Sequence, residues 1–220
     1  MMASSSSSDL DRLAAEIRAC RICALQPIGP ALPHDPRPVL RVSTTARLLI
    51  ASQAPGLRVH KSGLPFDDAS GDRLRSWLQM DRETFYDTRR VCIAPMGFCF
   101  PGYDAAGGDL PPRRECAARW HDRLFALMPQ VDVVLAIGGY AHRYHFARLG
   151  QPLPKSARVD EIVRRWRDFE HAKPRLFPLP HPSWRNTGWL KRNPWFETEL
   201  LPDLRAAVAS ALSPSQLSSA

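Results

Sequence analysis

The chain has 220 residues, of which 44% are hydrophobic, so it is long and apolar enough to bury the core of one α/β domain. Its 30 Lys and Arg residues outnumber its 22 Asp and Glu residues, which gives a formal charge of +8. Such a charge favours a polyanionic partner such as nucleic acid, although it can also serve only to keep a protein in solution. No apolar run approaches the roughly 20 residues that cross a bilayer, and residues 1–8 lack the apolar core of a signal peptide. We therefore expect a cytoplasmic protein that does not bind membranes.

Both ends of the chain are small and polar. Residues 1–8 and residues 213–220 are rich in serine. Such segments bury too little apolar surface to offset the entropy lost on ordering, so we predict that both are disordered. No internal repeat and no Gly/Ser linker divides the chain between them. The simplest organisation is a single domain over residues 9–212.

Within this domain, short apolar segments alternate with helical patterns. In chain order we predict a helix over 9–19, a strand over 47–52, a helix over 70–78, a strand over 90–94, a helix over 114–127, a strand over 131–137, helices over 140–149 and 159–168, a strand over 175–179 and a helix over 195–211. This alternation predicts a three-layer α/β/α sandwich around a central four-stranded parallel sheet. We expect Asp9 and Ser70 to be the N-caps of the first two helices, and Gly138-Gly139 to let the third strand turn tightly into its helix.

Two short loops follow the first and the last predicted strand. Gln53-Ala54-Pro55-Gly56 comes after the first strand, and the loop from His181 to Asn186, with the sequence His-Pro-Ser-Trp-Arg-Asn, comes after the fourth. Ligands of open α/β sheets bind at the carboxyl ends of the strands. Prolines restrict both loops, and one carries an amide while the other carries an imidazole. We predict that the two loops meet across one pocket.

The cysteines form a second pattern. Cys20 and Cys23 make a Cys-x-x-Cys pair, Cys99 and Cys116 follow later, and Cys92 lies in the second predicted strand. Two thiolates spaced in this way can reach the same metal or cluster, and a cytosolic protein rarely keeps disulfides. The pattern therefore favours a metal or cluster at the first four cysteines. The alternative is that they are scattered small hydrophobic residues, as we expect for Cys92.

These motifs together resemble the uracil-DNA glycosylase superfamily. The resemblance rests on Gln53 to Gly56, on the stretch 62–72 with the sequence Ser-Gly-Leu-Pro-Phe-Asp-Asp-Ala-Ser-Gly-Asp, and on His181-Pro182-Ser183, and it is closest to families 4 and 5. In family 4, four cysteines hold a [4Fe-4S] cluster, and those resembled here are Cys20, Cys23, Cys99 and Cys116. Zinc is the alternative. The segments 95–102 and 108–113 differ from the usual family 4 connection, which indicates a less characterised bacterial-type subfamily.

The resemblance implies a hydrolase that cuts the N-glycosidic bond of uracil, or of a related deaminated base, in DNA during repair. Gln53 stands where family 4 has Glu, and Ala54 lacks the carboxylate of family 1, so the first loop has no ionisable group. Asp68 has the same relation to the following Ser-Gly-Asp as the catalytic Asp of family 5, which makes it the expected base or electrostatic stabiliser, with Asp67 as runner-up. His181 is expected to donate a hydrogen bond to the departing base, and Gln53 to contact that base.

Further roles follow from the same resemblance and from the chemistry of extruded bases. Phe66 is expected to stack on the base, Trp184 to act as a wedge in DNA, and Arg185 to contact phosphate. The remaining expected contacts are Ala54, Pro55, Gly56 and Ser183 to the substrate and Asn186 to DNA. The Asn with which the superfamily recognises uracil is not evident after the second strand, which leaves the base open. We expect a monomer. Two alternatives are a catalytically weak or inactive nucleic-acid-binding protein of this fold and an iron-sulfur sensing protein.

Overall fold

The computed structural model describes residues 3–213 of the chain. Over that range the central sheet consists of β1 (Leu48–Ala51), β2 (Val91–Ile93), β3 (Val133–Ile137) and β4 (Arg175–Leu179) in the order β2-β1-β3-β4. All neighbouring strands are parallel, and Leu48 of β1 lies opposite Val91 on one side and Val133 on the other. The prediction of a four-stranded parallel sheet is confirmed.

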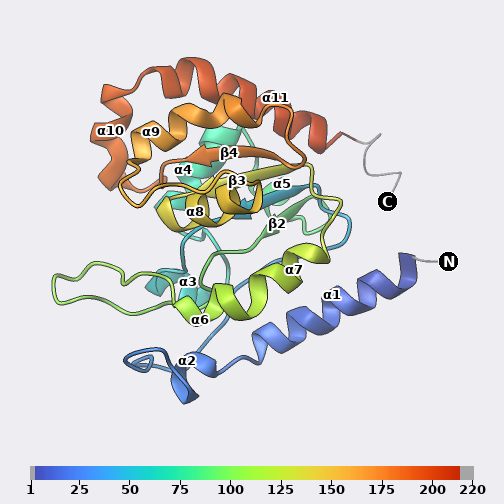
Figure 1. Ribbon diagram of the computed structural model, residues 1–220, viewed down its shortest axis with the longest axis vertical. Helices are drawn as coiled ribbons and strands as arrows, with labels where there is room; N and C mark the ends of the chain where they lie inside the picture. The colour runs from blue at the N-terminus through green and yellow to red at the C-terminus, as the bar shows by residue number, and fades with distance from the viewer. Residues whose placement is uncertain (1–2, 214–220) are drawn as a thin grey trace.

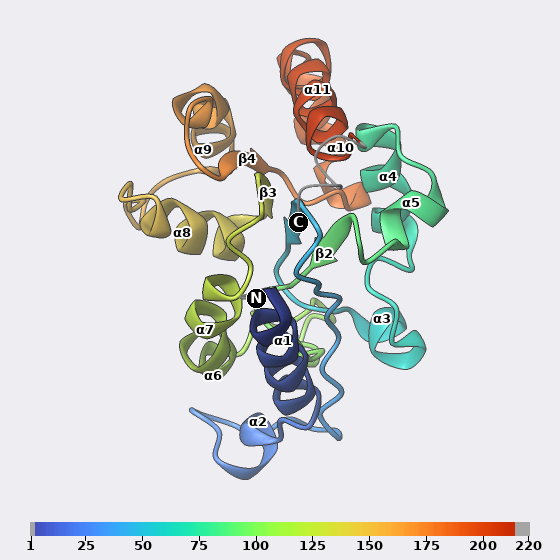
Figure 2. The same ribbon diagram turned by 90° about the vertical axis from the view of Figure 1, so that its right-hand side faces the viewer.

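Helices cover both faces of this sheet. Because strand side chains alternate, Leu48 and Ile50 pack into one apolar cluster and Leu49 and Ala51 into another. The first cluster includes residues of α4 (Ala69–Leu78), α5 (Arg82–Tyr86) and α11 (Leu201–Ala211). The second includes residues of α1 (Ala3–Arg18), α7 (Asp122–Ala126) and α8 (Gly139–Arg148). Figures 1 and 2 show the two groups of helices on opposite sides of the strands, which confirms the three-layer sandwich.

The other helical segments are short. They are α2 (Ile22–Leu25), α3 (Leu57–Ser62), α6 (Arg114–Cys116), η1 (Ala117–His121), α9 (Val159–Arg164), η2 (Arg165–Phe169), η3 (Trp184–Asn186), α10 (Thr187–Arg192) and η4 (Phe196–Leu200). Helices this short offer too few turns for a hydrophobic period, so α2, α3, α5 and α10 were not predicted. The π-helical turn η4 precedes Pro202 near the start of α11. Proline has no N–H for the α-helical bond, and a wider turn before it accommodates that loss.

Two predicted helix starts differ from the structure. The helix α1 begins at Ala3, so residues 3–8, for which disorder was predicted, form its first turns, and Asp9 lies inside the helix instead of capping it. The N-cap of α4 is Asp68 and not Ser70, because the Asp68 side chain accepts a hydrogen bond from the backbone N–H of Gly71 at 2.9 Å. Residues 1–2 and 214–220 lie outside the described range. The boundaries of the predicted domain, residues 9–212, stay a prediction.

Candidate active site

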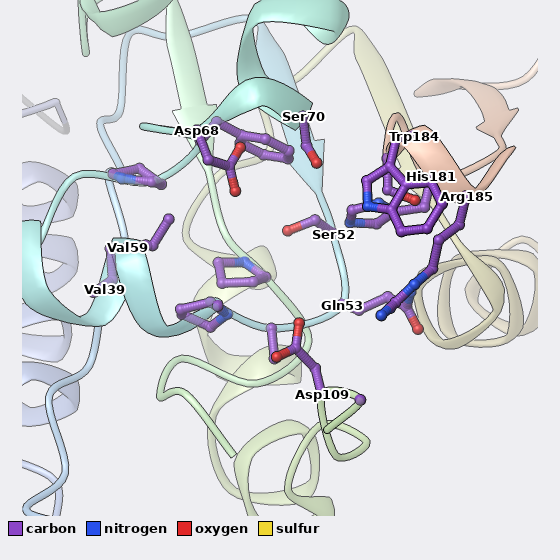
Figure 3. Close-up of a pocket in the computed structure, with 18 of the residues that line it drawn as sticks. Val39, Ser52, Gln53, Val59, Asp68, Ser70, Asp109, His181, Trp184 and Arg185 are labelled. Carbon is purple, nitrogen blue, oxygen red and sulfur yellow. The ribbon is translucent and has the colours of Figure 1, made fainter. Parts of the chain in front are cut away.

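The loops that follow β1, β2 and β4 border one cavity of about 650 Å³ at the carboxyl edge of the sheet. Gln53 to Gly56, Phe66, Asp68 and His181 all line this cavity, together with Ser183, Trp184, Arg185 and Asn186. In Figure 3, Asp68 lies on one side, His181 and Arg185 on a second and Asp109 on a third, around Ser52 and Gln53. The structure therefore brings together the two loops that the sequence places more than a hundred residues apart.

Backbone hydrogen bonds and one glycine fix the loop after β1. The carbonyl oxygens of Ser52 and Gln53 accept bonds from the N–H groups of Met96 and Gly97, each at 2.8 Å. The Gln53 side chain lies against Gly138, where a Cβ atom would be 2.9 Å from the Gln53 Nε2 atom. Gly138 also has a φ of +82°, which L-amino acids rarely adopt. The Gly-Gly turn after β3 thus provides the space in which Gln53 lies.

Side chains hold the loop after β4. Asn186 donates from Nδ2 to the His181 carbonyl oxygen at 2.7 Å, and Arg73 of α4 donates to the carbonyl oxygen of Ser183 at 2.9 Å and to Thr187 Oγ1 at 3.2 Å. Burial lowers the pKa of His181, and Arg185 lowers it further, while the carboxylates of Asp68 and Asp109 act in the opposite direction. A neutral imidazole at neutral pH can donate one hydrogen bond to an oxygen that becomes negative.

The segment before α4 brings an aromatic ring and a carboxylate to the cavity. Phe66 is 8% exposed, has a φ of +57°, and packs edge-on against Phe85 with ring centroids 6.1 Å apart. A Cβ atom on Gly71 would lie 1.8 Å from the Phe66 carbonyl oxygen, so only glycine fits there. Asp68 follows and uses one carboxylate oxygen to cap α4, which leaves the other free to face the cavity.

Asp67 points to a different partner. Its carboxylate accepts a hydrogen bond from Arg82 at 3.0 Å, and this bond lowers the pKa of Asp67. Asp67 is not among the residues that line the cavity. The contacts of Asp67 thus lie away from the cavity, and the ranking of the two acids stays a prediction.

Trp184 and Arg185 form the outer rim. Trp184 is 76% exposed, although exposed tryptophan is uncommon, and the Arg185 guanidinium lies 5.7 Å from the centre of its ring. An aromatic and a cation at the mouth of a cavity suit contact with a stacked base and a phosphate. Asn186, which was predicted to contact DNA, has its amide nitrogen bonded inside the loop.

Two acidic residues that line this cavity, Asp104 and Asp109, were not singled out from the sequence, and Asp109 is the one that lies near both motif loops. It lines the cavity and lies close enough to His181, Arg185 and Asp68 to interact with their charges. The sequence does contain a local signal for this turn, because Gly107, Gly108 and the Pro111-Pro112 pair are typical of a tight turn with an acid at its base. No sequence pattern shows, however, which sheet edge such a turn approaches.

Four cysteines border a second and much smaller cavity of about 10 Å³. Cys20 lies just after α1, Cys23 in α2, Cys99 after β2, and Cys116 in α6. Burial raises the pKa of Cys99 to about 12 and raises the pKa values of Cys23 and Cys116 as well. The Cys116 sulfur also accepts a hydrogen bond from the Phe98 N–H at 3.3 Å. Cys92 lies apart in β2, fully buried beside Ser43.

The donor set of this second cavity is all sulfur. Within residues 3–213, no three His, Cys, Asp or Glu side chains are arranged to hold one metal ion. A four-iron cluster binds its thiolates through different iron atoms, so its ligand sulfurs lie farther apart than those of a single zinc ion. Four thiols that border one cavity fit such a cluster in number and chemistry.

The fold and the cavity define an α/β protein with a small-molecule or nucleotide site at the carboxyl edge of its sheet. The family model of the uracil DNA glycosylase superfamily matches residues 41–205, from before β1 into α11. The chain belongs to that superfamily. The match contains both loops, Phe66, Asp68 and Asp109, and it begins after Cys20 and Cys23. Among residues 3–213, no helix has both the length and the apolar character to cross a bilayer.

Proposed function

We propose that this protein is a DNA glycosylase that hydrolyses the N-glycosidic bond of uracil, or of a related deaminated base, in DNA. The observation that carries the proposal is that Gln53, Phe66, Asp68 and His181 line a single cavity in a member of this superfamily. A volume of about 650 Å³ falls within the range of small-molecule sites and admits one extruded nucleotide.

The inner wall of the cavity suits a nucleobase. Phe66, Ile93 and Pro95 are buried and apolar, and together they offer a surface on which a planar base can stack. Gln53 provides one amide donor and one amide acceptor beside them. An amide of this kind can pair with the edge of a base that presents both a carbonyl and an N–H group.

Bond cleavage leaves negative charge on the base and positive charge on the sugar. His181 is neutral because burial lowers its pKa, and it donates a hydrogen bond to the base oxygen that becomes negative. Asp68 keeps one oxygen for the cap of α4 and uses its carboxylate charge to stabilise the sugar cation or to orient water. No step requires an ionisable group in the loop after β1.

DNA binding begins at the rim. Trp184 stands exposed beside the cavity and is placed to fill the space that an extruded nucleotide leaves in the duplex. Arg185 lies next to it and contacts a phosphate, and the formal charge of +8 favours DNA over the whole surface. Asn186 contributes by fixing His181, through the bond to its carbonyl oxygen.

We further propose that Cys20, Cys23, Cys99 and Cys116 hold a [4Fe-4S] cluster, with zinc as the alternative. When bound, such a cluster cross-links the segment between α1 and α2, the loop after β2 and the helix α6. The four thiols have to lose their protons on binding, and burial opposes this loss at Cys23, Cys99 and Cys116 because it raises their pKa values. The chemistry in the main cavity does not pass through this site.

The test is base release from labelled oligonucleotides that contain uracil, hypoxanthine or xanthine, followed by cleavage at abasic sites. We expect cleavage of at least one of them without added metal or nucleotide. The matched control is His181→Ala protein prepared in the same way, because a contaminating glycosylase would act equally in both preparations. Intact oligonucleotides at micromolar enzyme, with DNA binding retained, would instead make the protein a silent binder.

A further inference from the structure

A hairpin between β2 and α6 forms the third wall of the cavity. Tyr103 and Asp109 pair across it as an antiparallel bridge, and the Leu110 N–H donates to the Gly102 carbonyl oxygen at 2.9 Å. At its tip, one carboxylate oxygen of Asp104 accepts bonds from the N–H groups of Ala106 and Gly108 at 2.9 and 2.8 Å. These bonds give the hairpin one shape, and they hold Asp109 at its base beside the cavity.

Asp109 lies across the cavity from Asp68, and Gln53 lies to one side of them, near Arg185 (Figure 3). One oxygen of Asp109 is 3.8 Å from the position of a Cβ atom on Gly56, which places it over the loop after β1. Asp109 also borders a neighbouring cavity of about 240 Å³, together with Gln53 and His181. The side chain thus stands where the two cavities meet, close to both motif loops.

Its carboxylate is free for chemistry. Asp68 caps α4, Asp67 pairs with Arg82, and Asp104 holds the hairpin turn. In the part of the chain that the structure describes, by contrast, no N–H or O–H group lies close enough to donate a hydrogen bond to the Asp109 carboxylate. An acid that is held in place by its backbone and has no partner of its own is suited to a substrate.

The charged groups around Asp109 indicate which side of the cavity would hold the sugar of a bound nucleotide. Partial burial raises the pKa of Asp109, and the carboxylates of Asp68 and Asp104 raise it further, while Arg185 and His181 act in the opposite direction. The apolar wall that suits the base lies deep, whereas Asp109 and Arg185 are exposed at the mouth. A nucleotide whose base lies against the apolar wall and whose phosphate lies at Arg185 has its C1′ atom between that wall and Arg185.

We propose that Asp109 is a second catalytic carboxylate, which faces C1′ of the extruded nucleotide and accepts a proton from the attacking water. This inference rests on the proposed function. The bond between C1′ and the base nitrogen breaks, and its electron pair leaves with the base. The water oxygen then bonds to C1′, one water proton passes to Asp109, and Asp109 passes a proton on to the base anion, directly or through solvent. The products are the neutral free base and an abasic sugar with a hydroxyl group on C1′.

The first test measures binding and needs no turnover. A duplex with a pyrrolidine in place of one deoxyribose carries a protonated nitrogen, whereas tetrahydrofuran at the same position is neutral. We expect wild-type protein to prefer the pyrrolidine and Asp109→Asn to lose about tenfold or more of that preference. Asp104→Asn is the matched control, because it removes the same charge from the same hairpin while its amide oxygen still accepts both turn bonds.

The second test measures single-turnover base release against pH. Asp109 acts in its ionised form, so activity should rise with pH through a pKa above that of an ordinary Asp, and Asp109→Asn should be slow and lack this rise. If wild type releases a base while Asp109→Asn matches Asp104→Asn in rate and in analogue preference, the inference is overturned. If wild type releases no base, the proposed function fails, and the analogue preference alone decides whether Asp109 faces a positive sugar.

Discussion

The cavity between the two motif loops and the cavity between the four cysteines differ in what they need in order to act. The large one is open, about 650 Å³ in volume, and its loops are held by backbone bonds, by Gly138 and by Arg73. The small one, about 10 Å³, is bordered by four thiols, and burial raises the pKa values of three of them, Cys23, Cys99 and Cys116. On the proposed function, the reaction in the first uses side chains of the polypeptide. The second, on the same proposal, acts only when a metal or cluster replaces the thiol protons.

Because of this difference, we expect substitutions in the large cavity and substitutions at the four cysteines to change different properties of the protein. Changes to polar side chains of the large cavity such as Asp68 and His181 should alter rate and leave stability nearly unchanged, since these side chains are partly exposed. Changes at the four cysteines should alter stability and bound metal, because they act on buried packing and on the proposed cross-link between distant segments. The predictions below test this separation, in order of expected effect.

Replacing a cysteine of the small cavity should have the largest effect. Cys99→Ser should abolish the brown colour of anaerobically purified protein and its absorbance at about 400 nm, because a cluster that lacks one of its thiolate ligands is lost. Thermal unfolding should move to lower temperature in parallel. Cys92→Ser is the control, since Cys92 is buried elsewhere and should leave the colour unchanged. Colourless wild type with one zinc would identify structural zinc, and wild type without any metal would contradict the site.

His181→Ala should have the next largest effect, confined to the rate. Loss of one donor aimed at developing negative charge typically slows the reaction by about a hundredfold or more, while DNA affinity should change little. Single-turnover cleavage and a binding titration measure the two quantities separately. His171→Ala, at an exposed position, serves as the control. Unchanged cleavage by His181→Ala would remove this imidazole from the mechanism.

Asp68→Asn should slow single-turnover cleavage by about tenfold or more, because it removes the charge and keeps the shape. The fold should be preserved, since an Asn oxygen caps a helix about as well as an Asp oxygen. Asp67→Asn should be mild, because it breaks only a partly exposed ion pair with Arg82. Both variants are measured on one uracil-containing duplex. A slow Asp67→Asn beside a near-normal Asp68→Asn would mean that the roles of the two residues are exchanged.

Gly138→Ala should have the smallest effect and should act on both stability and rate. The added Cβ would meet Gln53, and alanine would have to adopt a backbone conformation that is essentially limited to glycine, which costs about 1–3 kcal/mol; the displaced amide should slow cleavage several-fold. Gly139→Ala is the control, because an added Cβ meets nothing within 4 Å there. Thermal unfolding and cleavage rates measured side by side distinguish the two. Equal behaviour of the two variants would show that Gly138 does not position Gln53.

The sequence predicted the elements whose signals are local. Short apolar runs located all four strands, and the prolines and glycines around Gln53 and His181 located the two loops at the sheet edge. The sequence assigned the N-cap of α4 to Ser70, because Ser and Asp are both favoured N-cap residues. Only the hydrogen bond from the Gly71 N–H identifies Asp68 as the cap. Asp109 escaped notice for a different reason. Its place depends on how a hairpin folds back over the sheet, which no local pattern encodes.

The helix α4 has a consequence for segment exchange between members of the superfamily. Its first turns carry the cap Asp68, the glycine beneath Phe66, and Arg73, which binds the loop after β4 through Ser183 and Thr187. Residues 66–73 and 181–187 therefore behave as a matched pair. A chimera that receives one segment alone would leave either a guanidinium or a carbonyl oxygen without its partner. Grafts meant to change base preference should move both segments together.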